Sequence, residues 1–316
     1  MLEHRLSKLA AAATFILLVI GGTVNPTGSS LACPEPTLVC HGQLFPPMVG
    51  GVLYEHGHRL AAMTVGMLQI ALTIVLLMRR SDLKRLAWIL LGMVVLQGVL
   101  GAVTVKFKLP WYVSTSHLLL GMSYFATLIY TAFRTQPAPM VVELREHGNR
   151  RDQLGTARRW IGIACGAVFV QLLIGALVRH LGAAMVCLGI PTCTIGGDWW
   201  PEAPVQHLHM IHRGFGVVVG IITTIAAVQV FRRARSWPAL RALAVAAPIL
   251  VVVQIGLGVA TIMTMRSVPL AVGHFAGAAS LWAVWMSMWL MSGRRTAARA
   301  SSVDDVATIP GAVVMR

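Results

Sequence analysis

Charged residues are scarce in this chain of 316 residues, making up 12% of it against 56% hydrophobic residues. A soluble domain carries about 25% charged residues, so the composition excludes an ordinary soluble fold. Acidic residues are especially few, with 11 Asp and Glu against 26 Lys and Arg. The chain has long apolar runs instead, which indicate an integral membrane protein.

Eight of these runs are long enough to cross a bilayer as helices of about 20 residues. Their interiors lack Lys, Arg, Asp and Glu, and the exceptions, Glu55, Arg59 and Arg213, stand at helix mouths. The first run lacks a small-residue cleavage site, so we interpret it as a retained span. The sequence predicts an all-α integral membrane protein with eight transmembrane helices, near 8–26, 54–78, 86–105, 113–133, 159–178, 206–230, 242–265 and 270–292.

The net charge of +15 has a distribution that argues against nucleic-acid binding. Twenty of the 26 Lys and Arg lie at the N-terminus, near 79–85, 134–159 and 231–241, and in the C-terminal tail. These are alternate connections of an eight-span chain, and the positive-inside rule makes their side cytoplasmic. We therefore expect a multi-pass membrane protein with both termini in the cytoplasm.

Cysteine is also rare, with five residues and no Cys-x2-Cys spacing, which argues against a zinc site. Cys33 and Cys40 fall in the first predicted outer loop, and Cys187 and Cys193 fall in the third. Because an outer loop faces an oxidising compartment, the sequence predicts two local disulfides. Cys165 lies inside the fifth span, where we interpret it as a small apolar filler.

The two halves of the chain align with each other. A shift of 154 residues places Cys33 on Cys187 and His58-Arg59 on His212-Arg213. At an offset of 157 the aligned pairs are Gln97 with Gln254, Gly101 with Gly258, Thr104 with Thr261, and His117 with His274. We interpret the chain as two repeated four-helix bundles. The parts are an N-terminal half (1–133), a cytoplasmic linker (134–158), a C-terminal half (159–292) and a cytoplasmic tail (293–316).

Polar and small residues recur inside the third and seventh spans of this alignment. We expect the Gln and Thr side chains there to hydrogen-bond across helices, because polar groups in lipid need partners. Gly101 and Gly258 would let a neighbouring helix or a flat ligand approach closely.

Four histidines lie at one depth, four to six residues into the second, fourth, sixth and eighth spans: His58, His117, His212 and His274. Those spans run in the same direction, so each imidazole lies roughly 6–9 Å below the outer helix ends. Facing histidines in a bundle core can hold a haem iron from both sides. A single interfacial histidine is more often a satisfied polar residue, but four at equivalent places favour haem. A metal-ion site is the alternative, and no intramembrane carboxylate accompanies the pairs to complete one.

The halves differ at Glu55, which precedes His58 by three residues and so shares its helical face. The 154 shift places His209 at the same position. A carboxyl beside a haem can move protons or stabilise a cation, which predicts chemistry in the first half and electron transfer in the second. The alternative is a Glu that caps the second span. Arg59 and Arg213 have two interpretations, as partners of haem propionates or as interface anchors.

Five stretches, "NPTGSSLACPEPTLVCHGQLFPP", "YEHGHRLAA", "SHLLLG", "HMIHRGFG" and "GHFAGA", resemble haem A synthases of bacterial cytochrome oxidase assembly. The resemblance covers about residues 8 to 292. It implies an eight-span enzyme of the bacterial cell membrane, with haem sites towards the outer side, that oxidises a methyl group of haem O to the formyl group of haem A.

The resemblance also implies residue roles. His58 and His117 would bracket the substrate haem, with Glu55 as the acidic catalytic residue, and His212 and His274 would ligate a haem b cofactor. Cys33 and Cys40 would form a disulfide over the substrate half. Family members often have a Trp where this chain has "EPTLV", which puts the packing of that loop in question.

Other functions are weaker matches to the sequence. A bis-histidine dihaem cytochrome for electron transfer would not need Glu55 in one half only. A haem O synthase would need Asp-rich loops for Mg-diphosphate, and a transporter would need broken helices with midplane polar groups. We expect haem O as substrate, haem O synthase as a partner, and contact with membrane lipid. The sequence does not name the electron acceptor or the oxygen source, and it leaves open whether the chain forms a homo-oligomer.

Overall fold

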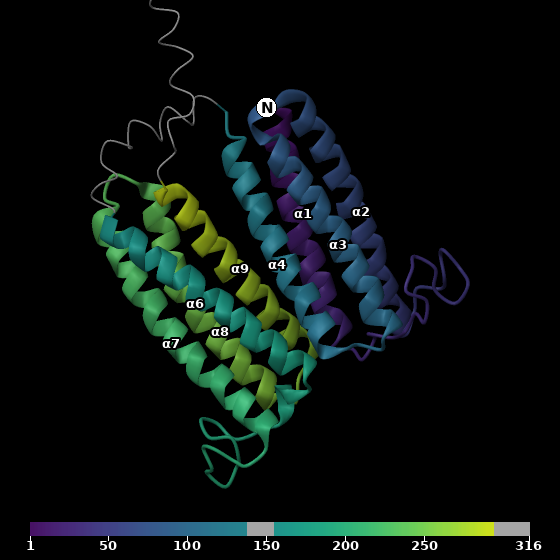
Figure 1. The fold of residues 1–316 in the computed structure, drawn as a ribbon. Helices are drawn as coiled ribbons and strands as arrows, with labels where there is room; N and C mark the ends of the chain where they lie inside the picture. Colours follow the sequence, from purple (N-terminus) through teal and green to yellow (C-terminus); the bar gives the residue numbers. More distant parts are fainter. Residues whose placement is uncertain (138–154, 294–316) are drawn as a thin grey trace, which may run out of the picture.

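The protein is all-α in a computed structural model that describes residues 1–137 and 155–293 (Figure 1). Most of the predicted linker 134–158 and of the predicted tail 293–316 therefore lies outside the described residues. Within the described ranges no β-strand occurs, and the one isolated bridge pairs Cys40 with Gln43.

Among the described residues, eight helices are long and apolar enough to cross a membrane, which confirms the predicted fold class. They are α1 (Leu2–Val24), α2 (Gly50–Arg79), α3 (Lys84–Lys106), α4 (Trp111–Arg134), α6 (Gly155–His180), α7 (Pro204–Arg233), α8 (Pro238–Met263) and α9 (Val268–Ser292). Two short 3-10 helices, η1 (Ser81–Leu83) and η3 (Ala183–Met185), precede α3 and follow α6. Each predicted apolar run overlaps one of the long helices.

The helices extend beyond the apolar runs that predicted them. α2 and α7 have 30 residues each, which gives a length of about 45 Å against a hydrocarbon core of about 30 Å. α7, α8 and α9 each carry a Pro in the first two positions, where the missing N–H leaves no hydrogen bond unmade. The start of a helix therefore depends on local residues such as these prolines as well as on hydropathy.

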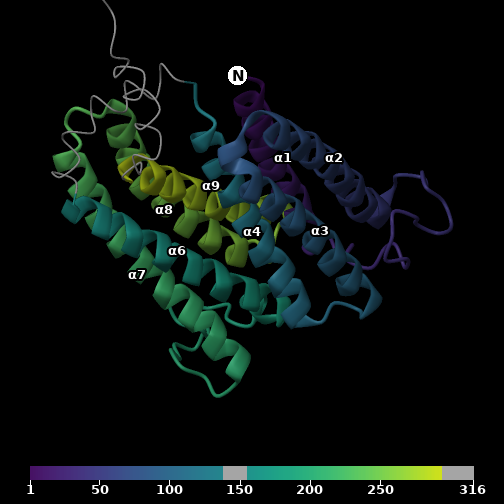
Figure 2. The same cartoon turned by 45° about the horizontal axis from the view of Figure 1, so that its top comes forward.

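The helices form two groups, α1–α4 and α6–α9, which lie side by side in both views (Figures 1 and 2). The groups meet through α1, α4, α6 and α9. At this junction the Trp282 indole Nε1 donates a hydrogen bond of 3.1 Å to the Met122 carbonyl, and both residues belong to the largest buried core cluster. Outward-facing apolar side chains such as Ile70, Val95 and Val252 are exposed, as lipid-facing residues are.

Two loops at one end of the bundle each contain a disulfide, Cys33–Cys40 in 25–49 and Cys187–Cys193 in 181–203. Both predicted pairings are confirmed. We call this the disulfide end. The α3–α4 and α8–α9 turns lie at the same end because each loop is followed by two antiparallel helices.

These two turns share an unusual backbone. Lys108 and Leu109 have φ of 56° and 66°, and Met265 and Arg266 have φ of 50° and 68°. Consecutive left-handed residues other than Gly are rare. The same left-handed pair occurs in both turns, at positions 157 residues apart, so the two turns have similar backbone conformations.

Candidate functional site

His212 on α7 and His274 on α9 face each other, with ring centroids 6.3 Å apart and ring planes at 79°. Two metal–imidazole bonds of about 2 Å each put the ligating nitrogens about 4 Å apart, and each ring centroid lies about 1 Å further back. The spacing of this pair therefore matches one metal ion held between two imidazoles. The structure brings together the two residues that the sequence predicted as one ligand pair.

Backbone and amide groups hold these rings in place. His274 Nδ1 donates to the Gln254 carbonyl at 3.0 Å, and Gln254 Nε2 donates to the His274 carbonyl at 2.6 Å. With its proton on Nδ1, His274 keeps the Nε2 lone pair for a metal. Gln171 Nε2 donates to the His212 carbonyl at 3.0 Å, and the same atom lies 3.2 Å from His212 Nδ1. Both rings are thus oriented by a neighbouring helix.

Glycines on the neighbouring helices make room for the rings. A Cβ at Gly175 would lie 3.1 Å from His212 Cε1, and a Cβ at Gly258 would lie 3.1 Å from His274 Cε1. Contacts this short are tighter than most real Cβ contacts. A side chain at either position would push an imidazole out of line, which confirms that Gly258 allows a close approach.

A cavity of about 800 Å³ lies against the pair. This volume falls within the range of about 300–1,000 Å³ that is usual for small-molecule and cofactor sites. Its lining is mostly apolar and includes His212, His274, Val219 and Leu281. The donors and the apolar walls fit a planar cofactor that is ligated through its iron.

The first half repeats the glycine contacts of both rings, and one of the two Gln contacts, around His58 and His117. A Cβ at Gly21 would lie 2.8 Å from His58 Cε1, and a Cβ at Gly101 would lie 3.3 Å from His117 Cε1. Gln97 Nε2 donates to the His117 carbonyl at 2.9 Å. Nδ1 of both imidazoles is buried without a hydrogen-bond partner among the described residues. A buried nitrogen left unpaired is costly, so these rings also fit a ligand-binding role.

The prediction of hydrogen bonds across helices is confirmed for the two Gln side chains and is wrong for the two Thr side chains. Gln97 reaches from α3 to α4, and Gln254 reaches from α8 to α9. Thr104 and Thr261 instead donate to carbonyls four residues back in their own helices. A short hydroxyl side chain reaches the i−4 carbonyl more easily than a neighbouring helix.

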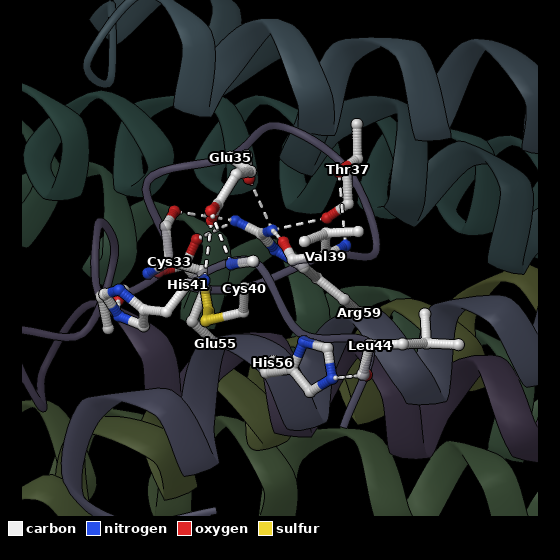
Figure 3. The surroundings of a disulfide bond; sticks show 12 residues. Cys33, Glu35, Thr37, Val39, Cys40, His41, Leu44, Glu55, His56 and Arg59 are labelled. Atoms are coloured by element: carbon white, nitrogen blue, oxygen red, sulfur yellow. Dashed lines mark hydrogen bonds and ion pairs between the residues drawn. A yellow bond between two sulfur atoms is a disulfide. The ribbon is translucent and has the colours of Figure 1, made fainter. Parts of the chain in front are cut away.

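Glu55 is buried, 4% exposed, and connects α2 to the first disulfide loop (Figure 3). Its Oε1 forms an ion pair of 2.5 Å with Arg59 Nη2, and its Oε2 accepts a hydrogen bond of 2.8 Å from the Cys33 backbone N–H. α2 begins after Val49 without a side-chain cap, so Glu55 does not cap that helix. Its present contacts anchor the loop beside Cys33–Cys40.

Arg59 and Arg213 hold the two disulfide loops in the same way. The Arg59 guanidinium donates to carbonyls of Cys33, Glu35, Thr37 and Val39. The Arg213 guanidinium donates to carbonyls of Cys187, Gly189 and Thr192, at 2.6, 2.7 and 2.9 Å. These contacts are neither of the two roles considered from the sequence, and the propionate role stays a prediction.

Two buried histidines received no role from the sequence. His56 Nε2 lies 3.0 Å from the Leu44 carbonyl, and this contact ties α2 to the 25–49 loop (Figure 3). The His56 ring also lies within 4.8 Å of the Cys33 and Cys40 sulfurs, which bond to each other. His209, the counterpart of Glu55, is 4% exposed and lines the cavity.

Two arginines in the cavity wall, Arg179 and Arg266, were also missed from the sequence. One signal could have found them. They belong to the six basic residues that lie outside the cytoplasmic clusters, against the charge bias of the rest of the chain. Arg59 and Arg213 belong to the same six.

Comparison with known proteins gives matches that run through this region. A sequence model of the family described as "Cytochrome oxidase assembly protein" matches residues 51–286, which include Glu55 and all four histidines. A protein of Exiguobacterium sibiricum named heme A synthase is 30% identical over 221 residues, 67% of this chain and 72% of its own. Proteins of the same name are 27% identical in Shouchella clausii (83% of this chain, 87% of theirs) and 25% identical in Macrococcus caseolyticus (86% and 92%).

Proposed function

We propose that this chain, which belongs to the haem A synthase family of cytochrome oxidase assembly proteins, is an enzyme that converts haem O to haem A. In this proposal a methyl group of haem O is oxidised to a formyl group. Each of two successive two-electron oxidations replaces one C–H bond of the methyl group with C–OH and passes two electrons to an external electron acceptor. The resulting hydrated aldehyde then loses water to give the formyl group. The relatives' shared name and the two histidine pairs at matching positions support this reaction.

The observation that carries the proposal is the edge-on pair of His212 and His274 at 6.3 Å beside an apolar cavity. We assign a haem b cofactor to this pair. Bound there, the haem supplies one-electron redox chemistry at its iron. Gln254 fixes the His274 tautomer, Gln171 orients His212, and the apolar lining excludes water from the site.

His58 and His117 are proposed to bind the iron of the substrate haem. Their glycine-backed rings and unpartnered Nδ1 atoms support this assignment. Glu55 projects from the same face of α2 as His58, one turn earlier. We assign it the acidic role in the reaction, as proton acceptor or as stabiliser of positive charge on the substrate. Its contacts with Arg59 and Cys33 give it a second role as loop anchor, which the variants described in the Discussion separate.

The proposed setting is a bacterial cell membrane, with the disulfide end on the outer side. The basic connections then face the cytoplasm, and both histidine pairs lie towards the outer surface. Haem O would come from haem O synthase. In this proposal electrons pass from the first haem site to the second.

Mass spectrometry of extracted haem distinguishes this enzyme from a bis-histidine cytochrome. The full-length protein is given haem O, and the haem is extracted after incubation with an electron acceptor. An enzyme yields formyl or hydroxymethyl derivatives, and His58→Ala abolishes them. A cytochrome that only transfers electrons returns haem O unchanged, and that result would exclude the proposed reaction.

A further inference from the structure

Three arginines line the cavity that His212 and His274 line, and one of them, Arg213, donates to carbonyls of the second disulfide loop. The guanidinium groups of the other two lie at the disulfide end of the cavity. Arg179 is in the last turn of α6, and Arg266 is in the turn between α8 and α9. Both side chains are partly buried and line the cavity wall. They come from segments 87 residues apart in the sequence, so only the fold brings them to one site.

Neither cation has an acidic partner. In the part of the chain that the structure describes, the ion pairs involve Glu3, Glu55 and Asp82, none of which contacts Arg179 or Arg266. The two positive charges also repel each other. Partly buried like charges without a counterion are unfavourable. A bound anion would therefore stabilise these two guanidinium groups.

The end of α1 holds the two guanidiniums in place without neutralising them. Arg179 Nη2 donates to the Gly21 and Gly22 carbonyls at 3.4 and 3.3 Å, and Arg266 Nη2 donates to the Asn25 carbonyl at 2.9 Å. These carbonyls belong to the negative end of the α1 dipole. A guanidinium has five N–H donors, and Arg179 Nε is buried with no partner among residues 1–137 and 155–293. The two guanidinium groups therefore have N–H donors left to bind a ligand at the cavity wall.

The first half has no counterpart of this pair. The 154 shift places Asn25 at the position of Arg179, and the 157 shift places Leu109 at the position of Arg266. Yet the turn around Leu109 has the same left-handed backbone as the turn around Arg266. The two partly buried arginines thus have no counterpart at the aligned positions of the first half, whose turn carries the exposed Lys106 and Lys108 instead.

We infer that Arg179 and Arg266 form a binding site for the two propionate carboxylates of the porphyrin held by His212 and His274. Guanidinium groups bind carboxylates through paired charge-assisted hydrogen bonds. The inference rests on the proposed function for the identity of the ligand. It gives the halves different affinities: the second half retains its haem by iron and carboxylates together, while the first half, without this pair, releases its product.

Haem and haem dimethyl ester are the probes that test the site, because esterification removes both carboxylate charges and leaves the iron. All titrations use the full-length, haem-depleted protein in a His58→Ala background, because this change removes the first proposed haem site and leaves the second. The protein is titrated with each probe, and binding is followed by absorbance. Arg179→Gln and Arg266→Gln should each weaken haem binding by about 10- to 100-fold, the range for loss of one charged hydrogen-bonding group. Affinity for the dimethyl ester should not change. Arg158→Gln, which removes a cation from the opposite end of α6, is the matched control and should bind haem as wild type does.

The outcomes separate this inference from the proposed function. If both arginine variants bind haem as tightly as wild type while His212→Ala does not, the carboxylate site is wrong and the haem site stands. If His212→Ala and His274→Ala bind haem normally, the proposed haem b site fails. Unchanged affinity for the ester shows that a variant has folded with its cavity intact. Equal loss of affinity for haem and ester would contradict a role in binding the carboxylates.

Discussion

Glu55 and Arg59, one helical turn apart on α2, form a buried ion pair with 2.5 Å between Oε1 and Nη2. Both side chains also reach the 25–49 loop, Glu55 through the Cys33 N–H and Arg59 through four carbonyls. Removing one member of a buried pair leaves the other uncompensated. This pair therefore connects loop structure with the acidic group assigned to catalysis, and the two roles need separate tests.

Glu55→Gln keeps the size of the side chain and an acceptor for the Cys33 N–H but removes the negative charge. If the carboxylate takes part in the reaction, haem A production falls by roughly 10²-fold or more, with haem O or a hydroxylated intermediate accumulating. Haem b content should persist, because His212 and His274 are untouched. His209→Glu should create no activity in the second half. Near-normal haem A production by Glu55→Gln would assign Glu55 to loop anchoring alone.

Arg213→Gln should loosen the second disulfide loop without releasing haem. Its guanidinium donates to three carbonyls of the 181–203 loop, and each charge-assisted bond contributes about 1.5–3 kcal/mol. Limited proteolysis should cut this loop faster than in wild type, while the haem b content stays constant. Loss of haem b with an unchanged cleavage rate would support a propionate contact for Arg213 instead.

Non-reducing peptide mapping of native membranes should recover Cys33–Cys40 and Cys187–Cys193 as linked peptides. The cysteines are separated by only seven and six positions, so chain entropy contributes at most about 2–3 kcal/mol per bond. We expect Cys187→Ser to lower stability modestly, with its main effect on the shape of the loop. Recovery of all four thiols in the free state would refute both pairings.

Acid should open the first loop at Glu35. The Glu35 carboxylate accepts backbone hydrogen bonds, including 3.0 Å bonds from His41 and Gly42, and these lower the pKa of this carboxyl below 4.5. A lowered folded pKa gives stability that is present above the unfolded pKa and lost as pH falls through the folded value. Hydrogen exchange over 35–43, corrected for intrinsic rates, should show protection at pH 6 that is lost as the pH falls below the usual Glu pKa of about 4.3 and through the lowered folded value. Glu35→Gln should remove this pH dependence, and the same acid response in that variant would exclude Glu35 as its cause.

The fold was predictable because hydropathy alone identifies membrane helices that satisfy their own backbone hydrogen bonds. The two disulfide pairings were predictable because each pair lies within one loop. The histidine pair of the second half was predictable because alignment of the halves placed His212 and His274 at one depth. Gly101 and Gly258 followed from the same alignment, as residues that allow close approach.

Contacts that depend on the course of a loop could not be predicted. The Arg59 and Arg213 guanidiniums turn to loop carbonyls whose positions no periodicity specifies. Arg179 and Arg266 meet only because α1 ends beside both. The Thr104 hydroxyl donates to a carbonyl in its own helix, so a polar residue at this position does not indicate a hydrogen bond to a neighbouring helix.

The optical and pyridine-haemochrome spectrum of the purified protein tests the two-site account most directly. The account predicts low-spin haem b in the wild-type protein, ligated by His212 and His274. His212→Ala and His274→Ala should each deplete it, while His58→Ala should retain much of it because its site belongs to the other half. Full haem b content in both His212→Ala and His274→Ala would contradict the assignment of the cofactor to the second half.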